Sequence, residues 1–406
     1  MLKLRHCIQA FLLFMIATIV GFLLVEAGLR ISNISYIQAY TYDENLGNVL
    51  RANAKGWYRK EGRTFIEINS DGLRDNEYSL VKPADTFRIA VLGDSFAEAL
   101  QVTAKKTFWS VMERELNSCI SFAGKNVEVI NFGVSGYGTA QELLILRHQA
   151  QKYDPDLIVL AFLTGNDICN NSKALSPDKM RPFFVYRDGI LELDLSFRNL
   201  PQYVSGQSWV KRNMRSASTH LYFVQLLYEL KLKWEANSQS VSRQSAQNEQ
   251  RSDQDKRLVH EPGLNMQVYQ EVPSPDWENA WKITEDLIIM MSDEVEKMGA
   301  GFLVVTLSNG IQVHPDPSVR RAFMDGAGIN NLFYPDERIR KVCTDAGISV
   351  LTLAQLFQAY AEKNDVCLHG FTNGTMCGGH WNEEGHLYAG RLIADEICKT
   401  GREYTR

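Results

Sequence analysis

The chain has 406 residues, of which 45% are apolar and 22% charged, and its formal net charge is −5 at pH 7. The apolar fraction is too high for a disordered protein, and 28 glycines with 11 prolines are too few for a collagen-like chain. The negative net charge argues against a nucleic-acid partner, because phosphate binding needs a basic face. The length by itself allows two or three domains.

The first predicted element is a membrane-spanning helix at residues 8–25, where only two side chains are clearly polar. About 17–25 such residues cross the hydrocarbon of a bilayer. The alternative is a cleaved signal peptide, with a weak cleavage site around Ala27. Lys3 and Arg5 precede the span, which favours an amino terminus inside and an extracytoplasmic body, periplasmic or at the cell surface. We therefore expect residues 1–34 to be a single-pass anchor and its flank.

Residues 35–85 are predicted to form a stalk and an irregular segment that leads into the domain, with turn residues at 69–72. Beyond them, short apolar strands alternate with helices. The predicted strands cover 87–92, 127–132, 157–163, 302–306 and 348–351, and the predicted helices cover 107–116, 140–153, 274–299, 335–346 and 382–398. Such alternation is typical of βαβ units and a parallel sheet. The sequence thus predicts one α/β domain at 86–400.

The alternation is interrupted at about 169–273, which we interpret as an insertion. It contains a predicted helix at 219–234, followed by a polar stretch at about 236–262 that cannot bury enough apolar surface to order itself. Loops at this edge of a sheet often carry binding residues. The insertion is therefore either a cap that sets the choice of substrate or a packed decoration.

Three predicted strands bring polar or flexible residues to the same edge of the sheet. The first ends at Gly93-Asp94-Ser95, the second leads into a glycine-rich turn with Gly136, and the third leads to Asn166. Ligands of open parallel sheets bind outside the carboxyl ends of the strands. A serine there, at the start of a helix, suits a nucleophile, while a backbone N–H and an amide suit a developing oxyanion.

The candidate general base is His380, which precedes the last predicted helix and can lie in the loop layer over the site. His386 falls inside that helix, with Ala389 and Ile393 on the same face, and is expected to be structural.

With these residues the sequence resembles the SGNH (GDSL) hydrolase superfamily. The blocks occur in the order of the superfamily: Gly93–Ser95, the turn with Gly136, Asn166, and a histidine before the last helix. The resemblance implies a three-layer, flavodoxin-like α/β/α sandwich with a five-stranded parallel sheet. It also implies that Ser95 is the nucleophile and His380 the base, and that the N–H groups of Ser95 and Gly136 with the Asn166 side chain form the oxyanion hole.

Two features depart from the pattern of the superfamily. Thr164 replaces the first glycine of the third block, although the asparagine of that block is retained. More seriously, the aspartate expected two or three residues before the histidine is absent, and Cys377 and Gly378 occupy those positions. Loss of an orienting acid can cost roughly 10⁴ in rate. Three alternatives follow. A backbone carbonyl orients the imidazole, another carboxylate such as Glu384 or Asp365 does so, or the activity is low. We favour a Ser–His dyad whose orienting group is unidentified.

Seven cysteines are too few for a disulfide scaffold of this size, but Cys367 and Cys377 are the expected pair by proximity. Cys119 and Cys343 are equally well explained as small buried hydrophobes. Four residues also have the types and spacings of a zinc site: Cys367, His369, Cys377 and His380. We prefer the disulfide, because a zinc site leaves the serine and asparagine at the strand ends unexplained.

The function predicted from these features is a serine esterase that forms an acyl-enzyme. The expected substrate is a small acyl ester. The predicted location and the substrates common in the superfamily suggest the O-acetyl groups of cell-envelope carbohydrate. One alternative is a membrane-anchored O-acyltransferase that modifies envelope polysaccharide. The other is a non-catalytic, carbohydrate-binding protein of the same fold. No cofactor, metal or nucleic acid is expected, the membrane is contacted through residues 8–25, and the oligomeric state is not predicted.

Overall fold

The computed structural model describes residues 2–232, 234, 261, 264–271 and 274–404. At its centre lies a five-stranded parallel sheet with the order β11-β10-β7-β5-β6. The strands are β5 (Thr86–Gly93), β6 (Asn126–Asn131), β7 (Leu157–Leu163), β10 (Gly301–Leu307) and β11 (Ser349–Thr352). Numbered along the chain, this is the order 2-1-3-4-5 of flavodoxin-like folds. The predicted sheet is confirmed, and each strand lies within one residue of its predicted ends.

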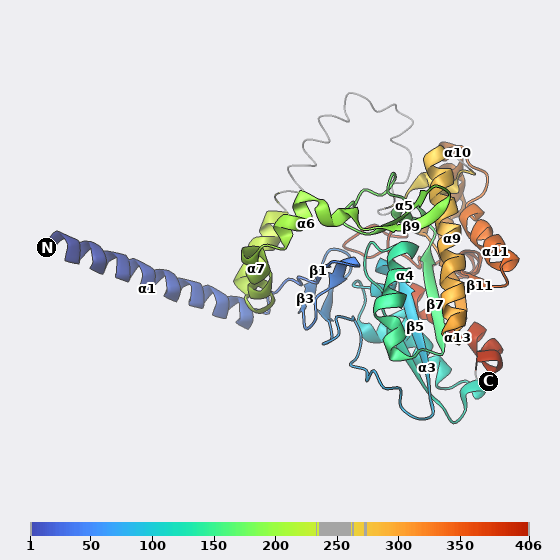
Figure 1. Ribbon diagram of the computed structural model, residues 1–406, viewed down its shortest axis with the longest axis horizontal. Coiled ribbons are helices and arrows are strands. Elements are labelled where there is room, and N and C mark those ends of the chain that lie inside the picture. Colours follow the sequence, from blue (N-terminus) through green and yellow to red (C-terminus); the bar gives the residue numbers. More distant parts are fainter. Residues whose placement is uncertain (1, 233, 235–260, 262–263, 272–273, 405–406) are drawn as a thin grey trace.

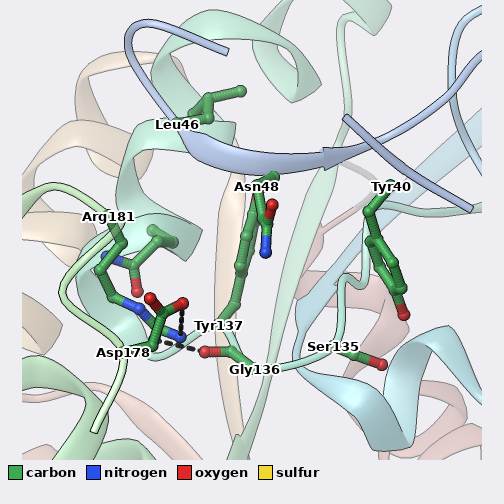
Figure 2. A pocket seen from close by; sticks show the side chains of 9 residues that line it. Tyr40, Leu46, Asn48, Ser135, Gly136, Tyr137, Asp178 and Arg181 are labelled. Atoms are coloured by element: carbon green, nitrogen blue, oxygen red, sulfur yellow. Dashed lines mark hydrogen bonds and ion pairs between the residues drawn. The ribbon is translucent and has the colours of Figure 1, made fainter. Parts of the chain in front are cut away.

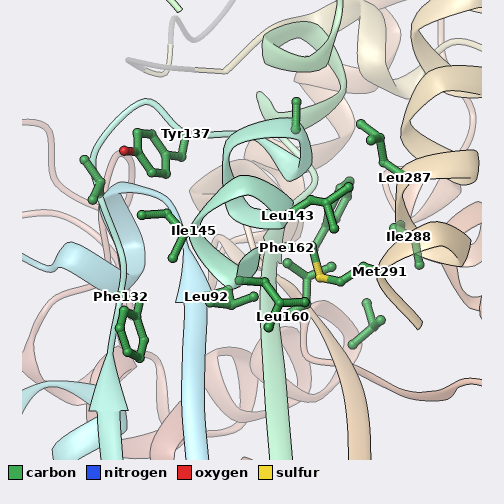
Figure 3. Packing of buried hydrophobic residues seen from close by; sticks show 14 of the residues in the cluster. Leu92, Phe132, Tyr137, Leu143, Ile145, Leu160, Phe162, Leu287, Ile288 and Met291 are labelled. Carbon is green, nitrogen blue, oxygen red and sulfur yellow. The ribbon is translucent and has the colours of Figure 1, made fainter. Parts of the chain in front are cut away.

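Helices cover both faces of the sheet, as its apolar strands require (Figure 1). One face is covered by α4 (Thr139–His148), α9 (Pro275–Lys297) and α11 (Tyr334–Asp345). The other is covered by α3 (Phe108–Leu116), α12 (Ala354–Asn364) and α13 (Glu383–Tyr404). Figure 3 shows part of the first face, where Leu287 and Met291 of α9 pack toward Leu160 and Phe162 of β7. The expected three-layer sandwich is therefore present.

Residues 35–85 do not form the predicted stalk. They fold into two small antiparallel hairpins that pack on the domain. The first pairs β1 (Tyr40–Asp43) with β2 (Gly47–Leu50), and the second pairs β3 (Lys55–Tyr58) with β4 (Thr64–Glu67). Buried apolar residues of this segment, such as Ile66, join the core on the first face of the sheet. Burial of these side chains, which a stalk would leave in water, favours the packed arrangement.

The amino-terminal helix α1 (Leu2–Ile31) projects away from the domain (Figure 1). It contains a candidate membrane span of 28 residues, Leu4–Ile31, whose most apolar window is not buried by the rest of the chain. A signal sequence meets the same criteria of length and composition. Retention of α1 as an anchor, and an extracytoplasmic body, therefore stay predictions.

The insertion between β7 and β10 is more structured than its composition indicates. It contains the hairpin β8 (Phe183–Arg187) and β9 (Ile190–Asp194), followed by α6 (Pro201–Gly206) and α7 (Trp209–His220). The helix predicted at 219–234 corresponds to the helical residues 222–232, which Leu221 separates from α7. The polar loop predicted at about 236–262 lies outside the described residues, except for Glu261.

Candidate active site

Ser95 lies at the carboxyl end of β5, where the strand turns into α2 (Ser95–Glu98). The turn is stabilised by Asp94, whose Oδ1 accepts a hydrogen bond of 2.9 Å from the Phe96 N–H. Ser95 is half-buried, so its hydroxyl faces the edge of the sheet, as the sequence predicts. The helix behind it is shorter than expected, because α2 has only four residues and ends at Ala99 with φ 53°.

The hydroxyl of Ser95 is directed at His380. Its Oγ lies 2.8 Å from Nε2 of His380, whereas the distance to Oδ2 of Asp94 is 3.3 Å. Nδ1 of His380 lies 2.6 Å from Oε2 of Glu61. Because a carboxylate only accepts hydrogen bonds, Nδ1 carries the proton of the neutral ring and Nε2 accepts from Ser95. This is the tautomer that a general base needs.

The carboxylate that contacts the imidazole of His380 is Glu61, and neither of the two carboxylates suggested from the sequence makes this contact. The second oxygen of Glu61, Oε1, also accepts a hydrogen bond of 3.0 Å from the backbone N–H of His380. Glu384 instead accepts from the hydroxyl of Tyr360 at 3.0 Å. Asp365 caps the carboxyl end of α12 in the left-handed conformation. Neither hydrogen-bonds to the imidazole, because both are committed to the α12–α13 side of the fold.

Glu61 is held in its ionised form by His380. Burial is the largest influence and raises the pKa of Glu61, but the hydrogen bonds and charge of His380 outweigh it. The resulting pKa of Glu61 lies below its ordinary value. The side chains of Glu61 and His380 are 18% and 24% exposed, so the pair is only partly screened by water. An ionised Glu61 therefore stabilises the imidazolium that forms when His380 takes a proton.

The turn that carries Glu61 is fixed to the loop that carries His380. Glu61 lies between β3 and β4, and the amide of Asn373 bonds both backbone groups of the next residue, Gly62. Each of these two hydrogen bonds is 2.8 Å long. Gly379 adopts φ 76°, and a Cβ at that position would lie 2.6 Å from Oε1 of Glu61. Glycine is therefore required where the two loops meet.

Sequence reasoning missed Glu61 because its partner lies 319 residues further along the chain. The pattern of the superfamily predicts an acid close to His380 in the chain, whereas Glu61 belongs to a segment that the sequence predicts to be a stalk. A charged residue before a glycine in a turn is common, so no local pattern distinguishes this glutamate.

A buried hydrogen-bonded chain supports the loop before His380. Nε1 of Trp381 donates to Oγ of Ser308 at 2.9 Å, and this oxygen lies 3.0 Å from Nε2 of His369. Nδ1 of His369 lies 2.6 Å from the carbonyl oxygen of Gly379. The consistent assignment has Ser308 donating to Nε2 and Nδ1–H donating to the carbonyl. Burial lowers the pKa of His369 to about 4, so this ring is neutral near pH 7.

The expected disulfide between Cys367 and Cys377 is present and closes this loop. A second disulfide joins Cys119 to Cys398, so the interpretation of Cys119 as a buried hydrophobe is wrong. Cys343 is buried and free, as that interpretation expects. The zinc alternative loses both of its sulfur ligands, because zinc binds thiolates and these two sulfurs are bonded to each other.

The predicted oxyanion donors lie at the ends of the two strands that flank β5. Gly136 follows β6 with φ 81°, and its carbonyl accepts a hydrogen bond from Arg181 of the insertion. Among the described residues, no backbone hydrogen bond uses its N–H. Asn166 follows β7, and its Oδ1 is enclosed without a hydrogen-bond partner among the described residues. Its side chain also contributes a hydrogen bond to Asp94, whose pKa burial raises.

Beside Gly136 lies a cavity of about 280 Å³ (Figure 2). Its walls come from three regions: the β1–β2 hairpin with Tyr40 and Asn48, the turn with Tyr137, and the insertion with Asp178 and Arg181. Arg181 and Asp178 form an ion pair of 3.1 Å. The cavity thus combines aromatic rings with amide, carboxylate and guanidinium groups, next to the predicted oxyanion hole.

No protein-family model and no curated protein matches the sequence. Among solved structures, the chain is similar to an acetyl xylan esterase, with 12% identity over 77% of this chain and 100% of that one, and a TM-score of 0.37. It is also similar to a lipase/acylhydrolase from Enterococcus faecalis, with 12% identity, coverages of 77% and 96%, and a TM-score of 0.34. A third is a protein ascribed to the lipolytic G-D-S-L family, from Desulfitobacterium hafniense, with 9% identity, coverages of 76% and 98%, and a TM-score of 0.33. At these TM-scores, function has to be argued from the site itself.

Proposed function

We propose that this chain is a serine esterase of the SGNH type that acts on small acyl esters. The observation that carries the proposal is the continuous hydrogen-bonded chain from Ser95 through His380 to Glu61, with distances of 2.8 and 2.6 Å. A serine hydroxyl, an imidazole in the correct tautomer and a half-buried carboxylate are together the parts of a nucleophilic triad. The carboxylate is a glutamate here and comes from the amino-terminal hairpin.

In the proposed reaction, Oγ of Ser95 attacks the ester carbonyl while its proton moves to Nε2 of His380. The C–O bond to the alcohol then breaks, and the alcohol oxygen takes the proton from Nε2. Water attacks the acyl-enzyme in the same way, with His380 again as base, and releases the carboxylic acid and free Ser95. The N–H groups of Ser95 and Gly136 and the amide of Asn166 are the proposed donors to the oxyanion.

The proposed substrates are O-acetyl groups on cell-envelope carbohydrate. Two observations support this class: the cavity beside Gly136 has tyrosine rings and hydrogen-bonding side chains suited to a sugar, and α1 is apolar enough to anchor the chain at a membrane. A non-catalytic protein of this fold needs no carboxylate against the imidazole, whereas Glu61 contacts Nδ1 of His380. The acyltransferase alternative uses the same triad and differs only in which hydroxyl attacks the acyl-enzyme.

The test is turnover of p-nitrophenyl acetate by the full chain in detergent, compared with Ser95→Ala and His380→Ala. We expect each variant to lose about 10³-fold or more in kcat. A fluorophosphonate probe, followed by mass spectrometry, is expected to modify Ser95 and to leave Ser95→Ala unmodified. Equal turnover by all three proteins, without modification of Ser95, would overturn the proposal. Transfer of acetyl to an added glycan, in place of release as acetate, would identify the transferase.

A further inference from the structure

We propose that α7 lies along the membrane surface and gives the chain a second contact with the lipid bilayer beside α1. The proposal rests on α1 being retained as a membrane anchor, and it is independent of the proposed esterase activity. The occupant of the exposed face of α7 is then the headgroup and upper acyl-chain region of the bilayer.

The first observation is the apolar face that α7 exposes. Trp209, Val210 and Met214 have 71%, 57% and 61% of their surfaces exposed. Successive residues of a helix are about 100° apart, so these three side chains fall within an arc of about 140°. Lys211, which is also exposed, lies outside this arc, whereas the polar residues Asn213 and His220 fall within it. Apolar side chains gathered on one face of an exposed helix mark an interaction surface, whereas scattered ones do not.

The second observation is the charge of α7. The segment contains three basic residues (Lys211, Arg212 and Arg215) and no acidic residue. Helices that lie in the membrane interface combine a tryptophan-containing apolar face with lysine and arginine. Each basic residue near an anionic leaflet contributes about 1 kcal/mol of attraction. The sequence of α7 therefore complements an anionic lipid surface.

The third observation is the set of contacts between the end of α1 and the end of α7. The carboxylate of Glu26, the first residue after the apolar stretch of α1, accepts the backbone N–H groups of Tyr222 and Phe223 at 3.1 and 2.9 Å. Arg30, one turn later, donates to the carbonyl of His220, the last residue of α7. Figure 1 shows α7 beside the end of α1 that joins the domain. If residues 8–25 span the hydrocarbon, the carboxyl-terminal end of α7 is therefore held at the level of the headgroups.

The neighbouring helix continues this exposed apolar surface. Leu227 and Leu230 are 50% and 52% exposed, and Trp234 beyond them is 72% exposed. Phe223 of the same helix packs edge-on against Phe22 of α1, with ring centroids 5.2 Å apart. An aromatic residue of this helix thus contacts the spanning helix, so a bilayer that surrounds α1 lies close to the helix that follows α7.

The test compares two adjacent positions on α7 in the full chain. Cys7, the one exposed free cysteine of the described residues, is first changed to serine. An environment-sensitive fluorophore is then attached to Val210→Cys or Lys211→Cys, and each protein is reconstituted into nanodiscs of phosphatidylcholine and phosphatidylglycerol in about a 3:1 ratio. Doxyl-labelled phosphatidylcholine quenches a fluorophore only when that fluorophore contacts the acyl chains.

We expect the label at position 210 to be quenched at least about threefold more than the label at position 211. The quenching at 210 is expected to weaken when phosphatidylglycerol is omitted. Equal quenching at both positions, or none at either, would overturn the proposal. A label at 210 that is shielded from water without lipid quenching would instead show that a second copy of the chain covers this face, and failure of the chain to insert into nanodiscs would remove its premise.

Discussion

At the scale of single residues, a carboxylate contacts His380 as the superfamily pattern predicts, but it comes from a distant part of the chain. The positions before His380 hold Cys377 and Gly378. Neither has a carboxylate that can accept a hydrogen bond from Nδ1–H of the imidazole. Glu61 reaches the same nitrogen from another part of the chain and also accepts the His380 backbone N–H. With two contacts to one residue, the carboxylate fixes both the tautomer and the orientation of the imidazole.

Glu61→Gln is predicted to reduce kcat by about 10³- to 10⁴-fold with little change in KM. The amide is nearly isosteric, but it carries no charge to stabilise the imidazolium and can favour the wrong tautomer. The measurement is steady-state turnover of p-nitrophenyl acetate. Glu67→Gln is the matched control, because Glu67 lies on β4 of the same hairpin and is exposed. Wild-type kcat in Glu61→Gln would show that another group orients His380.

The buried ring of His369 predicts a dependence of stability on pH. Burial lowers its pKa to about 4 in the folded chain, whereas an unfolded histidine titrates near 6.5. Between these values the unfolded state binds the additional proton. The free energy of unfolding therefore falls as the pH drops from about 6.5 toward 4, by at most about 3 kcal/mol from this residue.

The measurement is urea unfolding of the wild type and of His369→Gln at several pH values across this window. The variant is expected to be less stable at neutral pH, since its side chain cannot make both hydrogen bonds in the same geometry. It is also expected to lose less stability than the wild type on acidification. Comparison of the two proteins removes the contribution of other buried groups such as His386, whose pKa burial also lowers. Parallel pH profiles would show that His369 is protonated in the folded state.

At the scale of elements, the site depends on two loops that meet above the sheet. The β3–β4 hairpin supplies Glu61, and the loop closed by the Cys367–Cys377 disulfide leads to His380. Asn373 joins them, since its amide bonds the backbone of Gly62 on one side and belongs to the disulfide loop on the other. The distance between Glu61 and the imidazole is therefore set by backbone contacts as well as by the side chains themselves.

Asn373→Ala is predicted to lower kcat by about tenfold and to leave KM within about twofold, because it misplaces Glu61 without removing it. Asn373→Asp keeps the acceptor for the Gly62 N–H and should recover part of the loss. Thr372→Ala is the control, since Thr372 is an exposed neighbour in the same loop. The measurement is steady-state kinetics of the three variants. A positioning role predicts partial recovery of kcat in Asn373→Asp. A general loss of folded protein would lower the active fraction, and aspartate would not restore it.

The central sheet and its helices could be predicted from the sequence, whereas the hairpins formed by β1 to β4 could not. The seven-residue strand β7 is a continuous apolar run, and β5 is apolar or glycine at every position except Thr86 and Arg88. Long helices such as α9 have clear starting residues. The strands β1 to β4 have only four residues each, too few to establish a period of two. Their pairing is decided by burial against the domain, which a local pattern does not contain.

At the scale of the whole molecule, parts distant in sequence form one domain around the site. The amino-terminal hairpins supply Glu61 and one wall of the cavity, while the sheet supplies Ser95. The insertion contributes Arg181, which bonds the Gly136 carbonyl, and Glu261, whose carboxylate accepts the N–H of Gly379 at 3.2 Å. The same insertion carries α7, so the proposed membrane contact and the catalytic loops belong to one connected structure.

Four features could be predicted from the sequence alone: the five-stranded sheet, the apolar α1, the Ser–His pair and the disulfide in the histidine loop. These features depend on local periodicity, on residue types at strand ends, or on cysteines close together in the chain. The contact of Glu61 with His380, the packing of residues 35–85 on the domain and the place of α7 beside the end of α1 come from the fold alone. Each of these depends on contacts between residues far apart in the chain, where the energy comes from packing and hydrogen bonding that no local pattern records.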